Sequence, residues 1–149
     1  MEMTGEQLIP LPQETTWRAL NDTEILKTCI PGCESIDKQS DNEYLLTMTA
    51  RVGPVSAKFK GKMTLLDVQA PDAYTLLFEG QGGVAGFAKG QASVRLVPEG
   101  DGTKLGYAVK AMVGGKLAQV GARLIDGVAK KLSEQFFSAF NERAQHINR

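Results

Sequence analysis

The chain has 149 residues, with 17 basic and 17 acidic side chains and a pI near 6.6. This length is typical of one domain with its own hydrophobic core, so we expect residues 1–149 to form a single domain. Nucleic-acid-binding proteins usually have an excess of Lys and Arg, which this sequence lacks, so nucleic acid is not an expected partner. No stretch approaches about 18 consecutive apolar residues, and the first thirty residues do not resemble a signal peptide, so a cytoplasmic protein is expected.

The first part of the chain predicts one strand and two short helices. Met3 to Ile9 is strand-like, and the prolines that follow it end the strand. A short helical stretch comes next. Thr23 is expected to cap a second short helix, which the Pro31-Gly32 turn ends before the chain becomes extended again in a second strand.

From Tyr44 onward the hydrophobic period changes to two, which is typical of half-buried strands. Tyr44 to Val52 alternates, and Val55 to Leu65 follows after the tight turn at Gly53-Pro54. Three lysines on the second of these strands, Lys58, Lys60 and Lys62, mark its solvent face. Contact of this face with a partner or with anionic lipid headgroups is an alternative interpretation. Three further strands are expected between Tyr74 and Val113.

The remaining segment is helical, because apolar residues recur at three- and four-residue steps from Leu117 to Phe140, over about seven turns. Burying this apolar stripe requires a sheet. We therefore predict an α+β fold, in which a curved sheet of seven antiparallel strands wraps around a long C-terminal helix, with two short helices after the first strand.

Four loops of this arrangement are expected to meet at one end of the sheet, because successive hairpins of a meander alternate between its two ends. These loops carry little side-chain bulk, and loops at the rim of a rigid scaffold commonly form a binding mouth. The predicted rim residues are Pro31, Gly32, Gly53, Pro54, Gly82, Gly83, Gly86, Gly114 and Gly115.

The inward faces of the strands and the start of the helix carry several small residues, which leave room for a cavity unless larger neighbours fill it. These small residues are Ala50, Ala57, Gly61, Ala92, Ala111, Ala118 and Gly121. The candidate ligand-binding residues are Met48, Phe59, Met63, Phe78, Phe87, Tyr107, Val109, Leu117, Val120 and Leu124. For any single one of these side chains, packing in a solid core is the favoured interpretation, and the cavity is expected from the set as a whole. Phe87, on a glycine-flanked loop, is the residue expected to move when ligand binds.

The sequence offers no catalytic or metal-binding set. Its single histidine, His146, lies close to the last residue, so neither a histidine-based triad nor a two-histidine metal site is expected. The spacing of Cys29 and Cys33 matches neither the C-x-x-C motif of redox proteins nor half of a four-ligand zinc site. Both are therefore interpreted as reduced structural thiols. The glycine-rich segment 80–90 opens no helix, so it does not fit a nucleotide-binding motif.

Several segments resemble one family. The run GGKLAQVGARLIDG at 114–127 is similar to the signature of CoxG proteins, the G-type subunits of carbon monoxide dehydrogenase, and IPGC (30–33), VGPV (52–55), GG (82–83) and AGFA (85–88) agree with it. The resemblance implies a helix-grip, START-like (SRPBCC) fold with an apolar cavity between sheet and helix.

The same resemblance implies a non-catalytic accessory protein of a molybdenum hydroxylase of the carbon monoxide dehydrogenase class. Its expected ligand is a hydrophobic molecule such as a quinone, with no intrinsic cofactor, and its expected location is cytoplasmic with peripheral association at the inner face of the membrane. Two alternatives stay open. One is an enzyme of the cyclase or hydrolase kind that uses Tyr44, Tyr74, Tyr107 or Glu79, and the other is an assembly factor with a closed core.

Overall fold

The computed structural model describes residues 1–147 and contains one seven-stranded sheet and four helices, besides one short 3₁₀ turn. In chain order the elements are β1 (Glu2–Ile9), α1 (Gln13–Leu20), α2 (Thr23–Cys29), β2 (Cys33–Ser40), β3 (Glu43–Val52), β4 (Val55–Gln69), β5 (Ala73–Gln81), the 3₁₀ turn η1 (Gly83–Ala85), β6 (Phe87–Glu99), β7 (Gly102–Gly114), α3 (Lys116–Gln119) and α4 (Ala122–Ala144).

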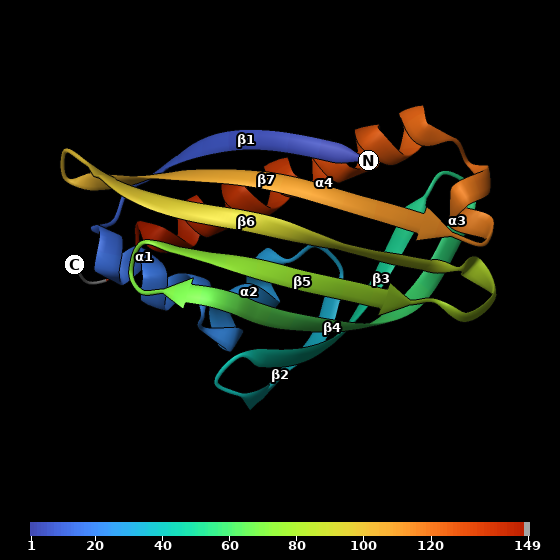
Figure 1. The fold of residues 1–149 in the computed structure, drawn as a ribbon, viewed down its shortest axis with the longest axis horizontal. Coiled ribbons are helices and arrows are strands. Elements are labelled where there is room, and N and C mark those ends of the chain that lie inside the picture. Colours follow the sequence, from blue (N-terminus) through green and yellow to red (C-terminus); the bar gives the residue numbers. More distant parts are fainter. Residues whose placement is uncertain (148–149) are drawn as a thin grey trace.

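The strands are ordered β1-β7-β6-β5-β4-β3-β2, and every neighbouring pair is antiparallel. The sheet curves around α4, and α1 and α2 lie against one end of it (Figure 1). The predicted α+β architecture is therefore confirmed, including the seven strands and the two short helices after the first strand.

The two faces of the sheet follow the predicted alternation. Phe59 and Leu65 of β4 are buried on the inner face, whereas the lysines between them are exposed on the outer face. Lys62 forms an ion pair with Glu43 at 3.2 Å, and Lys58 forms one with Glu34 at 3.5 Å. Ion pairs this exposed contribute little to stability, so the sheet is held mainly by its inner face and its hydrogen-bonded ladders.

The C-terminal helix is interrupted, whereas the apolar pattern predicted one continuous helix. A single turn, α3, ends at Gln119, and α4 begins only at Ala122, after Gly121 with φ +95°. A helical residue has φ near −63°, so the chain changes direction at Gly121, where only glycine adopts this conformation without strain. Figure 1 shows α3 at the end of the sheet and α4 running back along it.

The solid part of the core lies beneath the C-terminal half of α4. Phe140 is 1% exposed and packs with Ile9, Leu96 and Leu105, from strands β1, β6 and β7, and with residues of α1 and α2. Its ring stacks on that of Phe136 with centroids 5.9 Å apart. The start of α4 differs, since residues 122–124, 126 and 127 are exposed. Helix α4 is thus more deeply buried at its C-terminal half than at its start, where Ile125 and Val128 are only partly buried.

The N-cap of α2 is Asp22, and the predicted Thr23 is instead the first residue of the helix. The Asp22 carboxylate accepts hydrogen bonds from the backbone N–H groups of Glu24 at 2.9 Å and Ile25 at 3.4 Å. A carboxylate at this position also interacts favourably with the positive end of the helix dipole.

Replacing Asp22 with alanine is expected to lower the free energy of unfolding by about 1 kcal/mol, because the first N–H groups of α2 lose their acceptor. Urea unfolding measures the loss. Asp37→Ala, at an exposed position of β2, is the control and should leave the midpoint nearly unchanged. Equal losses in the two variants would show that the cap does not stabilise the protein.

Candidate functional site

A cavity of about 670 Å³ lies between the inner face of the sheet and the first half of α4. Its walls come from β3, β4, β5, β7, α3 and α4, and are mostly apolar. They include Met48, Phe59, Met63, Phe78, Val109 and Leu117. The exposed residues Met112, Ala118 and Ala122 also border the cavity, so its mouth lies between the end of β7 and the start of α4. A volume of this size is typical of a small-molecule site.

The floor of the cavity is formed by positions without side chains. Gly61 of β4 pairs directly with Gly80 of β5, and both line the cavity. A Cβ atom added at Gly80 would have no heavy atom nearer than 4.0 Å, where it would meet Cβ of Phe59. Ala50, Ala88 and Ala111 add little bulk on the neighbouring strands. The cavity is therefore deep because glycine and alanine occupy these positions instead of larger residues.

A smaller lobe of about 280 Å³ continues from the main cavity toward α1 and α2. The two share five lining residues, Ile30, Met63, Leu76, Val109 and Ser133. All three tyrosines of the chain, Tyr44, Tyr74 and Tyr107, line this lobe, together with Asn21. We call it the deep lobe. It combines apolar walls with a few polar groups, as sites that orient a ligand usually do.

Burial raises the pKa of the Tyr74 hydroxyl, and the neighbouring Tyr44 raises it further. Burial also raises the pKa of Tyr44. Both phenols therefore stay protonated at neutral pH and act as hydrogen-bond donors, which makes them poor general bases. The charged residues bordering the main cavity, Lys62, Glu79 and Asp126, are all exposed.

The candidate ligand-binding residues fall into three groups. The main cavity is lined by Met48, Phe59, Met63, Phe78, Val109 and Leu117, and the deep lobe by Met63, Tyr107 and Val109. Val120, Leu124 and Phe87 line neither. Val120 packs in a cluster with Phe59 and Leu117, and Leu124 lies over Gly53, where an added Cβ would meet its Cδ2 at 2.6 Å.

Phe87 lies on the outer face of the sheet, contrary to the expectation that it faces the ligand. It is the first residue of β6 and pairs with Gly114, and its ring covers the side of Gly114 where a Cβ would stand. Lys89 is 5.9 Å from the centre of the ring. The sequence placed Phe87 on a glycine-flanked loop, whereas β6 already begins at this residue.

Two of the four predicted rim loops, those at Gly86 and at Gly114-Gly115, meet at one end of the sheet. Gly86 and Gly115 are in close contact, and Gly53 contacts the start of α4. None of the nine predicted rim residues lines the cavity, however. The buried side chains of Val52, Phe59, Ala85 and Leu117 pack together at this end and close it. The opening lies to the side, near Gly121, which the sequence identified only as a small residue.

Several residues that border the cavity had no sequence signal. Met1 and Met3 reach it because β1 pairs with β7. Asp126 and Ser133 reach it because the start of α4 is fixed by the break at Gly121. Residues this far apart in the sequence are brought together only by the fold.

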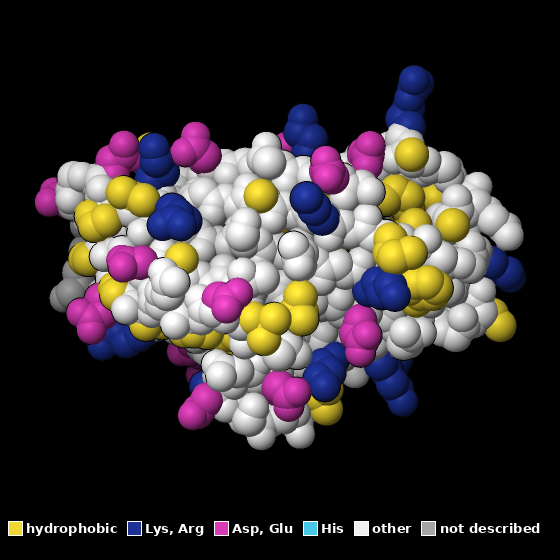
Figure 2. Space-filling model, viewed as in Figure 1, with side chains coloured by type: hydrophobic (Ala, Val, Ile, Leu, Met, Phe, Trp, Pro, Cys, Tyr) yellow, Lys and Arg dark blue, Asp and Glu magenta, His cyan; other side chains and the backbone are white. Residues whose placement is uncertain are grey.

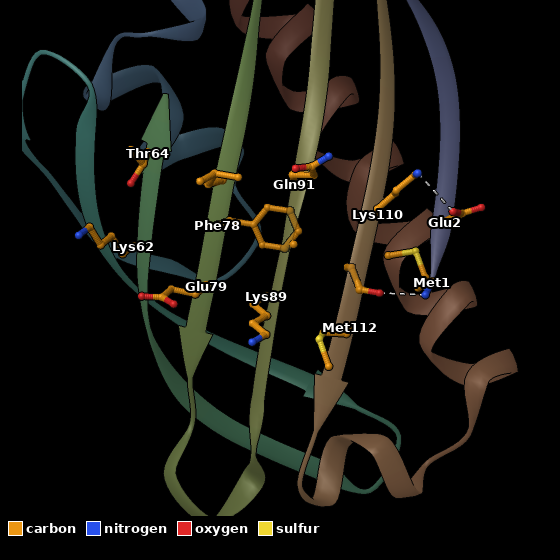
Figure 3. Close-up of a pocket in the computed structure, with 13 residues that line it drawn as sticks. Met1, Glu2, Lys62, Thr64, Phe78, Glu79, Lys89, Gln91, Lys110 and Met112 are labelled. Atoms are coloured by element: carbon orange, nitrogen blue, oxygen red, sulfur yellow. Dashed lines mark hydrogen bonds and ion pairs between the residues drawn. The ribbon is translucent and has the colours of Figure 1, made fainter. Parts of the chain in front are cut away.

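A second hollow of about 640 Å³ lies on the outer face of the sheet. Lys62, Glu79, Lys89 and Met112 lie in a row across strands β4 to β7 there (Figure 3). The backbone amino group of Met1 donates to the carbonyl of Ala111 at 2.9 Å beside this row. Charged side chains, namely Glu2, Lys62, Glu79, Lys89 and Lys110, border this hollow, whereas the walls of the inner cavity are mostly apolar, so the inner cavity is the better candidate for a hydrophobic ligand.

Hydrophobic side chains also gather on the surface at the end of the molecule that carries α3 and the start of α4 (Figure 2). Exposed members near this end include Val84 on η1, 86% exposed, Met112 on β7, 55% exposed, and Leu124 on α4. Within residues 1–147, no helix is long and apolar enough to cross a membrane, and no group of three His, Cys, Asp or Glu side chains is placed to hold a metal ion.

A curved antiparallel sheet closed over a cavity by a long C-terminal helix defines the helix-grip, START-like class of proteins. Solved structures of other proteins have the same fold. A START superfamily protein from Mycobacterium smegmatis has a TM-score of 0.75 at 16% identity, covering 99% of both chains. The ZhuI aromatase/cyclase from a Streptomyces species has a TM-score of 0.70 at 10% identity, covering 97% of this chain and 93% of its own. These two likenesses establish the fold alone.

The chain belongs to the CoxG family, the G-type subunits of carbon monoxide dehydrogenase, whose model matches residues 5–145. The resemblance seen in the sequence is thus confirmed. A conserved protein from Geobacillus kaustophilus is 31% identical, with a TM-score of 0.91 over 98% of this chain and 96% of its own. Among curated proteins, none has a sequence that matches. Family and fold together support a hydrophobic-ligand-binding role linked to carbon monoxide dehydrogenase.

Proposed function

We propose that this protein is a non-catalytic accessory protein that binds a quinone-like molecule in the inner cavity. It would serve a molybdenum hydroxylase of the carbon monoxide dehydrogenase class and connect that enzyme with the quinone pool of the membrane. The observation that carries the proposal is the 670 Å³ cavity, with its apolar walls and its glycine floor. A flat apolar ring with an isoprenoid tail suits a hollow of this volume and lining.

The link to the enzyme is supported by the family, which is named for one of the subunits of carbon monoxide dehydrogenase. The exposed residue Met112 borders the cavity, and hydrophobic side chains gather on the surface at the end of the molecule that carries α3 (Figure 2). A peripheral contact of this end with a membrane, or with the partner enzyme, would let an apolar ligand pass without crossing water.

The two other candidate functions are less well supported. An assembly factor with a closed core does not fit the open hollow beneath α4. A cyclase or hydrolase would need an acid or base inside the cavity. Tyr44 and Tyr74, with their raised pKa values, act only as donors at neutral pH, and Glu79 is exposed.

The single tryptophan, Trp17, provides a direct measurement. Its ring packs edge-on against Tyr74 with centroids 5.3 Å apart, immediately behind the deep lobe. Because quinones quench tryptophan fluorescence at short range, titration with menaquinone-2 is expected to give saturable quenching at one quinone per chain. N-acetyltryptophanamide under the same conditions corrects for absorption by the quinone.

A complementary measurement is mass spectrometry of a solvent extract of the protein after incubation with bacterial membranes. Recovery of an isoprenoid quinone supports the proposal. If quenching does not saturate and the extract contains no apolar molecule, the protein is not a carrier of such ligands.

A further inference from the structure

The deep lobe has a feature that an apolar carrier does not need, namely buried phenol groups. Tyr44 is 2% exposed and Tyr74 is 8% exposed, so both are more than nine-tenths buried. The chain has three tyrosines, and all of them border this one small space. A hydroxyl buried without a partner costs free energy, so such groups are normally satisfied by protein, water or ligand.

The hydroxyl of Tyr74 is a free donor in the lobe. Within residues 1–147 it makes no hydrogen bond to another residue. The one enclosed side-chain atom without a partner in that part of the chain is Oδ1 of Asn141. The Tyr74 hydroxyl therefore borders open space, which is the deep lobe. Trp17, packed against the ring, fixes its orientation.

The other two tyrosines differ from Tyr74. The Tyr44 hydroxyl donates to either the backbone carbonyl or the side-chain carbonyl of Asn21, each a long 3.4 Å, so it is only weakly engaged. The Tyr107 ring stacks on Phe137, with centroids 5.4 Å apart, and its hydroxyl end lies against Gly5 of β1, away from Tyr44 and Tyr74. The two available donors thus come from β3 and β5.

We infer that the deep lobe is a head-group subsite that binds a neutral hydrogen-bond acceptor, such as a ring carbonyl, through Tyr74 and secondarily through Tyr44. This inference rests on the proposed function and adds an orientation to it. The acceptor lies at the inner end, beside α1 and α2, and the apolar tail extends through the main cavity to the mouth beside α4. The apolar walls and the protonated phenols of the lobe disfavour a charged head group.

Two probes with the same tail test the subsite. Menaquinone-2 has two ring carbonyls, and 2-methyl-3-geranylnaphthalene has the same ring and tail without them. The wild-type protein is expected to prefer the quinone, because the hydrocarbon leaves the Tyr74 donor unsatisfied. The affinity of the naphthalene is measured by its displacement of menaquinone-2, which restores Trp17 fluorescence.

Tyr74→Phe is expected to weaken menaquinone-2 binding roughly fivefold, the worth of one neutral hydrogen bond, and to leave the naphthalene unaffected. Thr75→Val is the matched control. It removes a hydroxyl from the residue next to Tyr74 on β5, which faces the outer side of the sheet and lines neither cavity, so quinone affinity should not change. Tyr44→Phe should give a smaller loss than Tyr74→Phe. Thermal unfolding checks that each variant is folded.

Infrared spectra of menaquinone-2 labelled with ¹³C at its carbonyls report hydrogen bonding to the quinone directly, independently of its affinity. A hydrogen bond from a phenol lowers the carbonyl stretching frequency, so the band of the bound quinone should lie below that in hexane and shift back in Tyr74→Phe. Equal affinity for the two probes, with an unshifted band, would overturn the subsite while leaving an apolar carrier. Binding of neither probe would overturn the proposed function and the subsite together.

Discussion

Replacing Gly80 with phenylalanine is expected to reduce quinone affinity at least tenfold, the largest functional effect of any single change we foresee. The new side chain projects from the floor of the cavity, where the nearest heavy atom is 4.0 Å from the added Cβ. Its Cβ has no close contact, so the ring extends into the space of the ligand, and a tenfold loss corresponds to about 1.4 kcal/mol of binding free energy.

The same variant should unfold at an equal or higher temperature than the wild type. A glycine within a strand gives the unfolded chain extra freedom, and a phenylalanine on the inner face of β5 buries apolar area and favours the strand. Loss of ligand binding with gain of stability distinguishes a filled cavity from a damaged fold.

Gly106→Phe is the matched control for this experiment. Gly106 lies on β7 between the inward-facing Leu105 and Tyr107, so it faces outward, and no heavy atom lies within 4 Å of an added Cβ. Menaquinone-2 should bind this variant as it binds the wild type. If Gly80→Phe also keeps full affinity, the ligand does not occupy the cavity above the glycine floor.

Phe140→Ala is expected to lower the free energy of unfolding by about 3–5 kcal/mol, the cost of removing a fully buried aromatic side chain and leaving a void. Phe140 is 1% exposed and joins the C-terminal half of α4 to β1, β6 and β7. Because many single domains have a total stability of about 5–15 kcal/mol, this change removes a large part of it.

Urea unfolding followed by far-ultraviolet circular dichroism measures this loss. Leu124→Ala, at a residue that is 38% exposed near the other end of α4, serves as the control and should cost less than about 1 kcal/mol. Similar losses in the two variants would show that both ends of α4 contribute equally to stability, and would contradict the weaker packing of its start described above.

The architecture was predictable because its signals are local. The change of hydrophobic period after residue 44, the glycine and proline turns, and the apolar stripe of the last helix each occupy a continuous segment. Together they define seven strands and three of the four helices. The separation of α3 was missed because Leu117, Val120 and Leu124 keep a helical spacing through the interruption, and hydrophobic spacing does not report the backbone conformation of Gly121.

The site was only partly predictable. Met48, Phe59 and Val109 line the cavity because strand parity decides which face each residue occupies. Phe87 was misplaced for another reason, because the glycine-rich segment before it was interpreted as a loop although β6 begins at this residue. The position of the mouth depends on how α4 leaves the sheet after Gly121 and on the pairing of β1 with β7, which are tertiary features.

Because Gly61 of β4 and Gly80 of β5 face each other, the shape of the cavity can change through side chains at these positions while the backbone of the sheet stays the same. Relatives that keep the same strands can fit ligands of different length by exchanging glycine for alanine or valine at position 80, where an added Cβ is free of close contacts, whereas at position 61 the Leu46 side chain, 3.2 Å from an added Cβ, must also shift. Ligand preference within such a family is therefore free to diverge faster than the fold, and the side chains at positions 61 and 80 are the first to compare when two members are assigned different molecules.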